Sequence, residues 1–398
     1  MDRVLDGVRV IDFSQFKAGP TCTQILADMG AEVIRIERPG GSSDRNLPPY
    51  TPDGRSFYLS FTCRNKKGIT LDLRKKEGRE IMVDLVEKSD VVVESAGPSA
   101  NKKLGIDYAS LQQIKKDIIV VSMSAFGQDG PYAKRQGFDA IAQAMSGLMW
   151  VTGFPEEDRP ERVGVSFVDS AAGIYGALGT MLALRYRDKT GKGQLVDVSL
   201  LDTALSFMES IWGELKVAGQ PRPKVGNANV LTAPYDAYKA QDGWIFIGTA
   251  TSNQWESLCK ITGREELADD PRFNTMQKRC RIENISFFAE WLNEWVSTKR
   301  VEELVEMLNS VGIPCSPVNT LQQAFSDPQV RARNMIVEID SPGVGEIPLV
   351  GIPIKLSETP GAIRALEPSV GEHNEEVFHN LLKFTPERII RLKKSGVI

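Results

Sequence analysis

The chain has 398 residues, of which 41% are hydrophobic and 25% are charged, and its formal net charge is −4. A chain of this length is expected to form two or three domains, and its slightly acidic balance argues against binding nucleic acid or a membrane surface as a whole. The five cysteines are scattered, and the only histidines are His373 and His379. We therefore expect no disulfide framework, no metal site and no Ser–His–Asp triad. The first residues contain no apolar signal core, so we expect a cytoplasmic protein.

The first 126 residues alternate short apolar runs with amphipathic segments. The apolar runs have the length and the β-branched content of strands, and the segments between them are typical of helices. Strands separated by helices of this size predict a parallel sheet with helices on its faces. The expected strands cover residues 8–13, 31–38, 90–95 and 117–126, and the expected helices cover 19–30, 77–89 and 108–116.

The rest of the chain predicts a helical region, a second small domain and a tail. The tail, from about residue 326, is expected to contain two strands and a final helix over 371–384. The predicted fold class is therefore α/β, with a large domain built on a parallel sheet and a smaller α+β domain. The expected boundaries are 1–200 for the large domain, 201–224 for a linker helix, 225–325 for the small domain and 326–398 for a segment that returns to the large domain.

Basic residues are clustered just after several predicted strands, namely Arg38, Arg64 to Arg74 and the pair Lys102 and Lys103. In an open α/β sheet, ligands bind beyond the carboxyl ends of the strands, where such side chains suit phosphate groups. The alternative is a solvated charged face. The loop over 14–24 lacks the G-x-G-x-x-G pattern of dinucleotide-binding proteins.

The segment 163–193 holds one acid, Asp169, at the start of a long apolar helix with small residues. Gly173, Gly176 and Gly179 recur every third residue, which predicts close packing along one helix face. Asp169 itself has two interpretations. It is a residue type that caps helix N-termini, and a carboxylate fixed and kept ionised there is also a usable nucleophile.

Several motifs together resemble the class III CoA-transferases, the family of formyl-CoA:oxalate CoA-transferase and carnitine CoA-transferase. They are LDGVRVIDFSQFKAGPTCTQILADMGAEVIRIERPG, NKKGITLDLRKKEGRE, SAFGQDGPYA, FDAIAQAMSG, VDSAAGIYGALGTMLAL, GKGQLVDVSLLD, IPCSPV and GEHNEEV. They are spread over essentially the whole chain. The resemblance implies a Rossmann-like large domain, a small domain and an interlocked homodimer.

The resemblance also implies covalent catalysis on acyl-CoA and a small carboxylate, with coenzyme A as the bound cofactor. The family's nucleophilic aspartate corresponds to Asp169, and the resemblance implies that this residue forms an aspartyl-CoA thioester as an intermediate. The loop over 124–131 is expected to supply backbone donors to the developing oxyanion. The family's CoA contacts and active-site pair correspond to Phe16, Lys17, Ala18, Arg38, Leu71, Asp72, Arg74, Ser95, Lys103, Phe138 and Asp139.

Some positions depart from the oxalate-using branch. That branch often carries Asn-Phe where this chain has Ser95 and Ala96, an uncharged Gln at Lys17, and a run of four glycines that 225–236 lacks. Formyl-CoA and oxalate-like substrates nevertheless remain the best single expectation. The alternatives are a racemase or epimerase on the same fold, a non-catalytic acyl-CoA-binding protein and an acyl-CoA hydrolase. A racemase needs an acid and a base, and Phe138 occupies the slot where family racemases carry histidine.

Overall fold

The computed structural model describes residues 3–398, and their internal contacts divide them into two units. The first unit contains the chain up to Leu148, together with Val163–Glu209 and Ala332–Ile398. The second unit contains Met149–Arg162 and Ser210–Arg331. Each unit has a hydrophobic core of its own.

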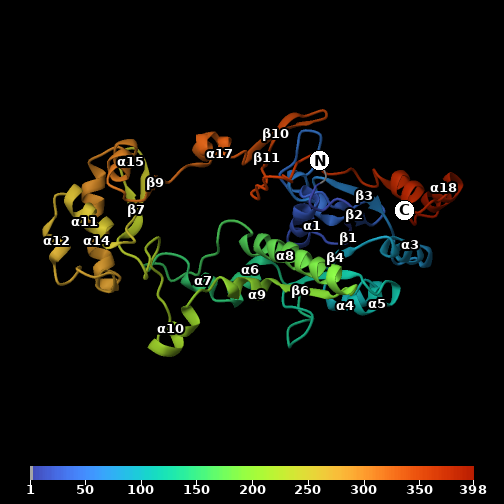
Figure 1. Cartoon of the computed structure of the whole chain (residues 1–398), viewed down its shortest axis with the longest axis horizontal. Coiled ribbons are helices and arrows are strands. Elements are labelled where there is room, and N and C mark those ends of the chain that lie inside the picture. Colours follow the sequence, from blue (N-terminus) through green and yellow to red (C-terminus); the bar gives the residue numbers. More distant parts are fainter. Residues whose placement is uncertain (1–2) are drawn as a thin grey trace. The chain divides into compact units, whose positions relative to one another are not determined.

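The first unit is built on a six-stranded sheet in which every neighbouring pair of strands is parallel. The strand order is β3-β2-β1-β4-β5-β6 (Figure 1), which confirms the predicted Rossmann-like α/β fold. The chain order reverses between β1 and β4, the point at which such sheets bind ligands. The strands are β1 (Arg9–Asp12), β2 (Glu32–Glu37), β3 (Lys66–Thr70), β4 (Val91–Glu94), β5 (Ile119–Ser124) and β6 (Leu195–Ser199).

Alternating side chains of these strands enter two separate cores, one on each face of the sheet. In β1, Val10 belongs to one core and Ile11 to the other, and in β4 the same holds for Val91 and Val92. This follows from the two-residue period of a strand, and it explains why the strands are apolar on both faces.

The helices of this unit are α1 (Ala18–Asp28), α2 (Phe57–Thr62), α3 (Lys76–Glu87), α4 (Pro98–Leu104), α5 (Tyr108–Ile114), α6 (Asp139–Met145), α8 (Phe167–Thr190), α9 (Leu200–Ser206) and α18 (Pro386–Lys394), with a 3₁₀ turn at Ser43–Asn46.

Helix α8 packs closely against α1 and β6 through its glycines. A Cβ at Gly173 would lie 2.7 Å from Cβ of Thr21, and one at Gly179 would lie 2.5 Å from Cγ1 of Val196. The predicted role of these glycines in helix packing is therefore confirmed. Within residues 3–398, α8 is also the one helix with the length and hydropathy of a membrane span, and half of its apolar window is buried inside the fold.

The second unit combines a small antiparallel sheet with helices around an aromatic core. Strands β7 (Tyr235–Lys239) and β8 (Trp244–Gly248) form an antiparallel hairpin, and β9 (Cys315–Pro317) pairs with β8. The ring of Trp255 contacts those of Phe273, Phe288 and Trp291 edge to face. The helices are α10 (Ile211–Ala218), α11 (Ser252–Ile261), α12 (Glu266–Asp269), α13 (Met276–Arg279), α14 (Ile282–Ser297), α15 (Val301–Ser310) and α16 (Leu321–Ser326), while α7 (Leu148–Val151) and α17 (Pro328–Ala332) span the unit boundaries.

The C-terminal segment differs from the prediction at its end. The two predicted strands form the hairpin β10 (Ile336–Ser341) and β11 (Gly345–Val350). The final helix predicted over 371–384 is shorter than expected and is not the last one: residues 374–381 are helical, with a π-helical part at Glu376–Leu381, and α18 follows. The reason is local, because Lys383 has a left-handed φ of 61° that ends the turn. Thr385 then accepts a hydrogen bond from Arg388 N and begins α18 with Pro386 in its first turn.

The close contact of α8 with α1 yields a stability prediction. Gly173→Ala should lower the free energy of unfolding by about 1–3 kcal/mol, because the new methyl group is forced against Thr21 and the carbonyl oxygen of Ala18. Urea denaturation measures this change. The matched control is Gly213→Ala in α10, where no atom lies within 4 Å of the added Cβ. That control should be neutral or stabilising by about 0.5–1 kcal/mol, and an equal loss in both variants would contradict the packing role.

Candidate active site

A cleft of about 420 Å³ opens where the order of the strands reverses. Its walls come from the segments that follow the carboxyl ends of β1, β4 and β5, together with the start of α8. Parallel strands bring these ends to one edge of the sheet, which is why segments distant in sequence meet there. The lining residues are Gln15–Gly19, Ser95–Ala100, Met123–Ala125, Ala133–Phe138, Asp169 and Leu200.

Six of the predicted site residues line this cleft. They come from four different segments and include the predicted nucleophile. Asp139 lies next to the lining and accepts a hydrogen bond of 3.0 Å from the Asp169 backbone N–H. The rings of the two lining phenylalanines meet edge to face, with their centroids 6.3 Å apart. The six lining residues are Phe16, Lys17, Ala18, Ser95, Phe138 and Asp169.

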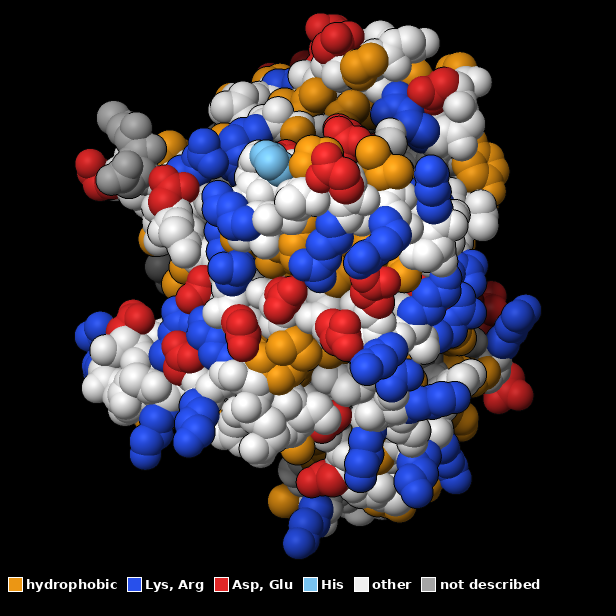
Figure 2. All heavy atoms as spheres, turned by 90° about the vertical axis from the view of Figure 1, so that its right-hand side faces the viewer, with side chains coloured by type: hydrophobic (Ala, Val, Ile, Leu, Met, Phe, Trp, Pro, Cys, Tyr) orange, Lys and Arg blue, Asp and Glu red, His pale blue; other side chains and the backbone are white. Residues whose placement is uncertain are grey.

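The other five predicted CoA contacts lie outside the cleft lining. Arg38 follows β2 and donates to the Gly41 carbonyl, while Lys103 is exposed near the end of α4. Leu71 is only 3% exposed and belongs to a core, so its side chain is unavailable to a ligand. Asp72 pairs with the exposed Arg74 at 2.8 Å. The face that carries α3, α5 and α18 mixes basic and acidic side chains (Figure 2).

The basic cluster at the start of β3 is structural, which corrects the phosphate-binding interpretation for these residues. Arg64 is buried in an ion pair of 2.7 Å with Asp28 in α1. Lys67 pairs with Glu32 and Glu376, both at 2.7 Å. Lys66 is buried in an ion pair of 3.0 Å with Asp12. The charges of Arg64 and Lys66 are neutralised inside the fold, whereas Lys67 and its two partners form a partly exposed ion-pair network at the surface.

Asp12, the last residue of β1, fixes the loop that forms one wall of the cleft. Its fully buried carboxylate accepts hydrogen bonds from Ser14, Thr23 and Lys66. Burial by itself raises the pKa of Asp12, but Lys66, the two hydroxyl groups and Arg35 outweigh it, and the pKa is lowered. The carboxylate therefore stays ionised and ties β1, β3 and α1 together beneath residues 14–17.

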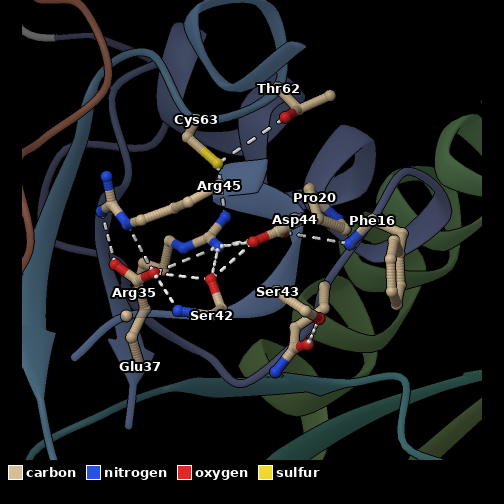
Figure 3. Close-up of polar contacts among 12 residues, drawn as sticks. Phe16, Pro20, Arg35, Glu37, Ser42, Ser43, Asp44, Arg45, Thr62 and Cys63 are labelled. Atoms are coloured by element: carbon tan, nitrogen blue, oxygen red, sulfur yellow. Dashed lines mark hydrogen bonds and ion pairs between the residues drawn. The ribbon is translucent and has the colours of Figure 1, made fainter. Parts of the chain in front are cut away.

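A second buried network holds Phe16 in place (Figure 3). Arg35 pairs with Asp44 at 2.8 Å, and the Asp44 carboxylate accepts the Phe16 N–H at 3.1 Å. Phe16 has a φ of 65°, a left-handed conformation that is costly for a phenylalanine. Burial raises the pKa of Glu37, but Arg45 and Arg35 lower it to about 2. Ion pairs between fixed groups thus stabilise the strained backbone beside the cleft.

Asp169 occupies the third position of α8, after the N-cap residue Ser166, so the capping interpretation is wrong. The expectation that Asp169 is ionised at neutral pH stands, but its pKa is raised and not held low by the helix terminus. Burial and the neighbouring Asp139 raise the pKa of Asp169 to about 6, and Lys17 opposes them. The carboxylate is therefore mostly ionised at pH 7 but more basic than an ordinary aspartate, which makes it a stronger nucleophile.

The backbone donors expected from 124–131 are partly occupied. The N–H groups of Gly127 and Gln128 donate to Ser124 and Asp197. The N-terminus of α1 offers better donors, because the first N–H groups of a helix have no intrahelical partner and favour negative charge. Ala18 and Gly19 begin α1 and line the cleft, so their amides suit an oxyanion or a phosphate.

Sequence reasoning missed three residues with chemistry near the cleft. Lys134 and Arg135 line it, and Arg135 stacks on the Tyr132 ring at 3.9 Å. The sequence does contain a sign of these two residues, because they are a basic pair in the segment that follows a predicted strand. The same pattern indicated the other basic clusters. Tyr58 in α2 gave no signal. Burial and then the charge of Asp169 raise the pKa of its hydroxyl, which stays protonated as a hydrogen-bond donor near Asp169.

Known proteins match this chain over nearly all its length. The family model of CoA-transferase family III matches residues 5–374. Succinyl-CoA–D-citramalate CoA-transferase of Chloroflexus aurantiacus is 36% identical, covering 100% of this chain and 98% of the relative. Formyl-CoA:oxalate CoA-transferase of Streptomyces coelicolor is 33% identical, covering 100% and 99%. The crystal structure of a CAIB/BAIF family protein from Brucella suis is 34% identical, covers 96% and 100% of the two chains, and superposes with a TM-score of 0.83.

These matches confirm the resemblance seen in the sequence motifs. The family model spans far more than half of the chain, and both relatives align over essentially their full lengths. The chain therefore belongs to CoA-transferase family III and is an enzyme of that family.

Proposed function

We propose that this enzyme transfers CoA from an acyl-CoA donor to a small free dicarboxylic acid, with Asp169 as the nucleophile. The observation that carries the proposal is a half-buried carboxylate, close to the positive charge of Lys17, in the cleft at the reversal point of the sheet. Such a group can attack a thioester, and the cleft offers amide donors for the charge that develops.

The chemistry balances without any added proton donor. An oxygen of Asp169 attacks the donor thioester carbon and the C–S bond breaks, so that CoA leaves as a thiolate and Asp169 and the donor acyl group remain joined as a mixed anhydride. The thiolate attacks the Asp169 acyl carbon, which releases the donor acid and leaves an aspartyl-CoA thioester. The acceptor carboxylate attacks that thioester and expels the thiolate, which gives a mixed anhydride between the acceptor and Asp169. The thiolate then attacks the acceptor acyl carbon, and the bond to the Asp169 oxygen breaks. Asp169 is regenerated as a carboxylate.

Lys17 supports an acceptor with a second carboxylate. It is half-buried and lies at the same cleft as the nucleophile. A lysine there can pair with the distal carboxylate of a bound acid while the proximal one reacts. The names of both aligned relatives include a dicarboxylic acceptor, D-citramalate or oxalate. We propose the same substrate class, which includes the expected oxalate-like acids.

We propose that CoA lies along the carboxyl edge of the sheet, from the cleft toward the residues that follow β2 and β3. The exposed groups Arg38, Arg74 and Lys103 then offer positive charge to its phosphates. A racemase finds less support. Among residues 3–398, no histidine lines the cleft: His373 accepts from the Gly68 amide, and His379 contacts the Phe384 carbonyl.

The outward side of α8 supports the proposed homodimer. Large apolar side chains are exposed along it in the single chain, among them Ile174 at 58%, Leu178 at 52% and Leu182 at 63%. A contiguous apolar stripe of this kind marks a protein–protein contact. We propose that a second copy of the chain covers it.

The nucleophile is tested by Asp169→Asn, which is nearly isosteric but cannot attack. We expect transfer to fall by about 10⁴-fold or more, while acyl-CoA binding measured by calorimetry is largely retained. Wild-type protein incubated with succinyl-CoA should carry a CoA adduct on the peptide containing Asp169 in mass spectra. Transfer near the wild-type rate in the variant would remove Asp169 from the mechanism, and CoA release without an acceptor acid would indicate a hydrolase.

The pH profile is tested through the neighbours of Asp169. Only the ionised carboxylate is nucleophilic, so kcat/KM should rise with pH through about 6 and level off above it. Asp139→Asn removes a negative neighbour and should move the inflection to lower pH, whereas Lys17→Gln removes a positive one and should move it higher. Shifts in the opposite directions would contradict the assignment of this rise in kcat/KM to the ionisation of Asp169.

The dimer is tested by Leu178→Glu, which places a charge in the exposed apolar stripe. Analytical ultracentrifugation should give a dimer for the wild type and a monomer for the variant, because burying an unpaired charge is costly. The control is Val217→Glu in α10, where the side chain is 90% exposed and lies outside α8. A monomeric wild type would refute the proposal.

A further inference from the structure

Glu94 is a buried carboxyl group beneath the cleft that the proposed mechanism does not use. It is the last residue of β4 and is completely inaccessible to solvent. The six residues that follow it, Ser95–Ala100, line the cleft, and α4 begins among them at Pro98. Glu94 is therefore the residue from which this wall of the cleft begins.

The partner of Glu94 is Asn101, a buried residue of α4. The Asn101 amide nitrogen donates a short hydrogen bond to Oε2 of Glu94. The other two oxygens, Oε1 of Glu94 and Oδ1 of Asn101, are also buried and have no hydrogen-bond partner. Both are acceptors when the acid is ionised, so neither can satisfy the other.

A single proton resolves both unpaired atoms. A neutral carboxylic acid donates through its O–H, whereas a carboxylate only accepts. With the proton on Oε1, Glu94 donates to Oδ1 of Asn101 while Oε2 still accepts from the amide nitrogen. This second hydrogen bond would give both unpartnered oxygens a partner and join the two side chains as a closed pair.

The charges around Glu94 favour this neutral form. Strand register aligns Glu94 with Ser122 of β5, and Ser122 with Asp197 of β6, so a second carboxylate lies in the same row. Burial is the largest effect on Glu94; Ser122, Asn101 and the Ala96 backbone oppose it, Asp197 adds to it, and the pKa is raised to about 7. No lysine or arginine is among the groups that shift this pKa.

We propose that Glu94 is a positioning residue: as a neutral acid it clamps Asn101 and thereby holds the first turns of α4 as a wall of the CoA cleft. Ionisation removes one of the two hydrogen bonds and loosens this wall. The effect of this ionisation on CoA binding rests on the proposed function, whereas the protonation of Glu94 in the fold does not depend on it.

The test compares wild type with Glu94→Gln at pH 6 and pH 8, using free CoA as the probe. A glutamine amide makes the same two hydrogen bonds with Asn101 as the neutral acid does, but it cannot ionise. The neutral fraction of Glu94 falls from about nine-tenths to about one-tenth over this range. We therefore expect the wild-type Kd for CoA to rise up to about tenfold more than that of Glu94→Gln.

Thermal unfolding provides a readout that does not depend on CoA. A raised pKa contributes stability that is lost as pH rises from the ordinary value of 4.5 through about 7. The Tm of the wild type should therefore fall relative to Glu94→Gln between pH 5 and pH 8. Glu87→Gln, an exposed glutamate in α3, is the matched control and should follow the wild type.

The outcomes separate the two proposals. If the Tm of wild type and of Glu94→Gln changed in parallel with pH, the proposal that Glu94 is neutral would be overturned. If the Tm profiles diverged but the CoA affinities were identical, the positioning role would be overturned. Asn101→Leu removes the partner and should weaken CoA binding at both pH values; unchanged affinity would also overturn it. A wild type that binds no CoA at either pH would refute the proposed function instead.

Discussion

The cleft depends on one buried ion pair, Asp12 with Lys66, at the end of the first strand. Taking a carboxylate and an ammonium group out of water is costly, and the cost is offset only when hydrogen bonds satisfy both groups. Here Ser14 and Thr23 complete the shell around Asp12, and the Pro20 carbonyl accepts from Lys66. Strand β1, strand β3 and helix α1 are therefore joined at a single point. Removing either charge leaves its partner buried and unpaired, at a cost of about 3–5 kcal/mol.

The carboxyl groups near this edge of the sheet fall into two classes with opposite shifts in pKa. Asp12 and Glu37 face buried cations, which hold their pKa low despite burial. Glu94 has no cation among the groups that shift its pKa, and at Asp169 burial and Asp139 outweigh Lys17, so both pKa values are raised. The first class holds the scaffold together. The second class lies at or just beneath the cleft, which is where groups with pKa values near neutrality are useful in catalysis.

Much of this could be predicted from the chain. The apolar runs up to residue 126 predict the parallel strands, because a strand covered on both faces is apolar throughout. The glycines at 173, 176 and 179 predict close packing of α8, which the contacts with Thr21 and Val196 confirm. Six of the predicted site residues meet at one cleft. The helix predicted at the end of the chain is followed by α18, because a left-handed backbone at Lys383, which propensity does not reveal, separates the two elements.

The sequence by itself determined the fold class, the family and the position of Asp169, because these depend on local periodicity and on motifs of contiguous residues. Only the tertiary structure decided what each charge does. Lys66 and Arg64 appear as free cations in the sequence, yet burial opposite Asp12 and Asp28 makes them structural. The basicity of Asp169 and the pairing of Glu94 with Asn101 also depend on burial and on neighbours from other strands and helices. The electrostatic energy of a group is set by the distances and the dielectric around it, which exist only once the chain has folded.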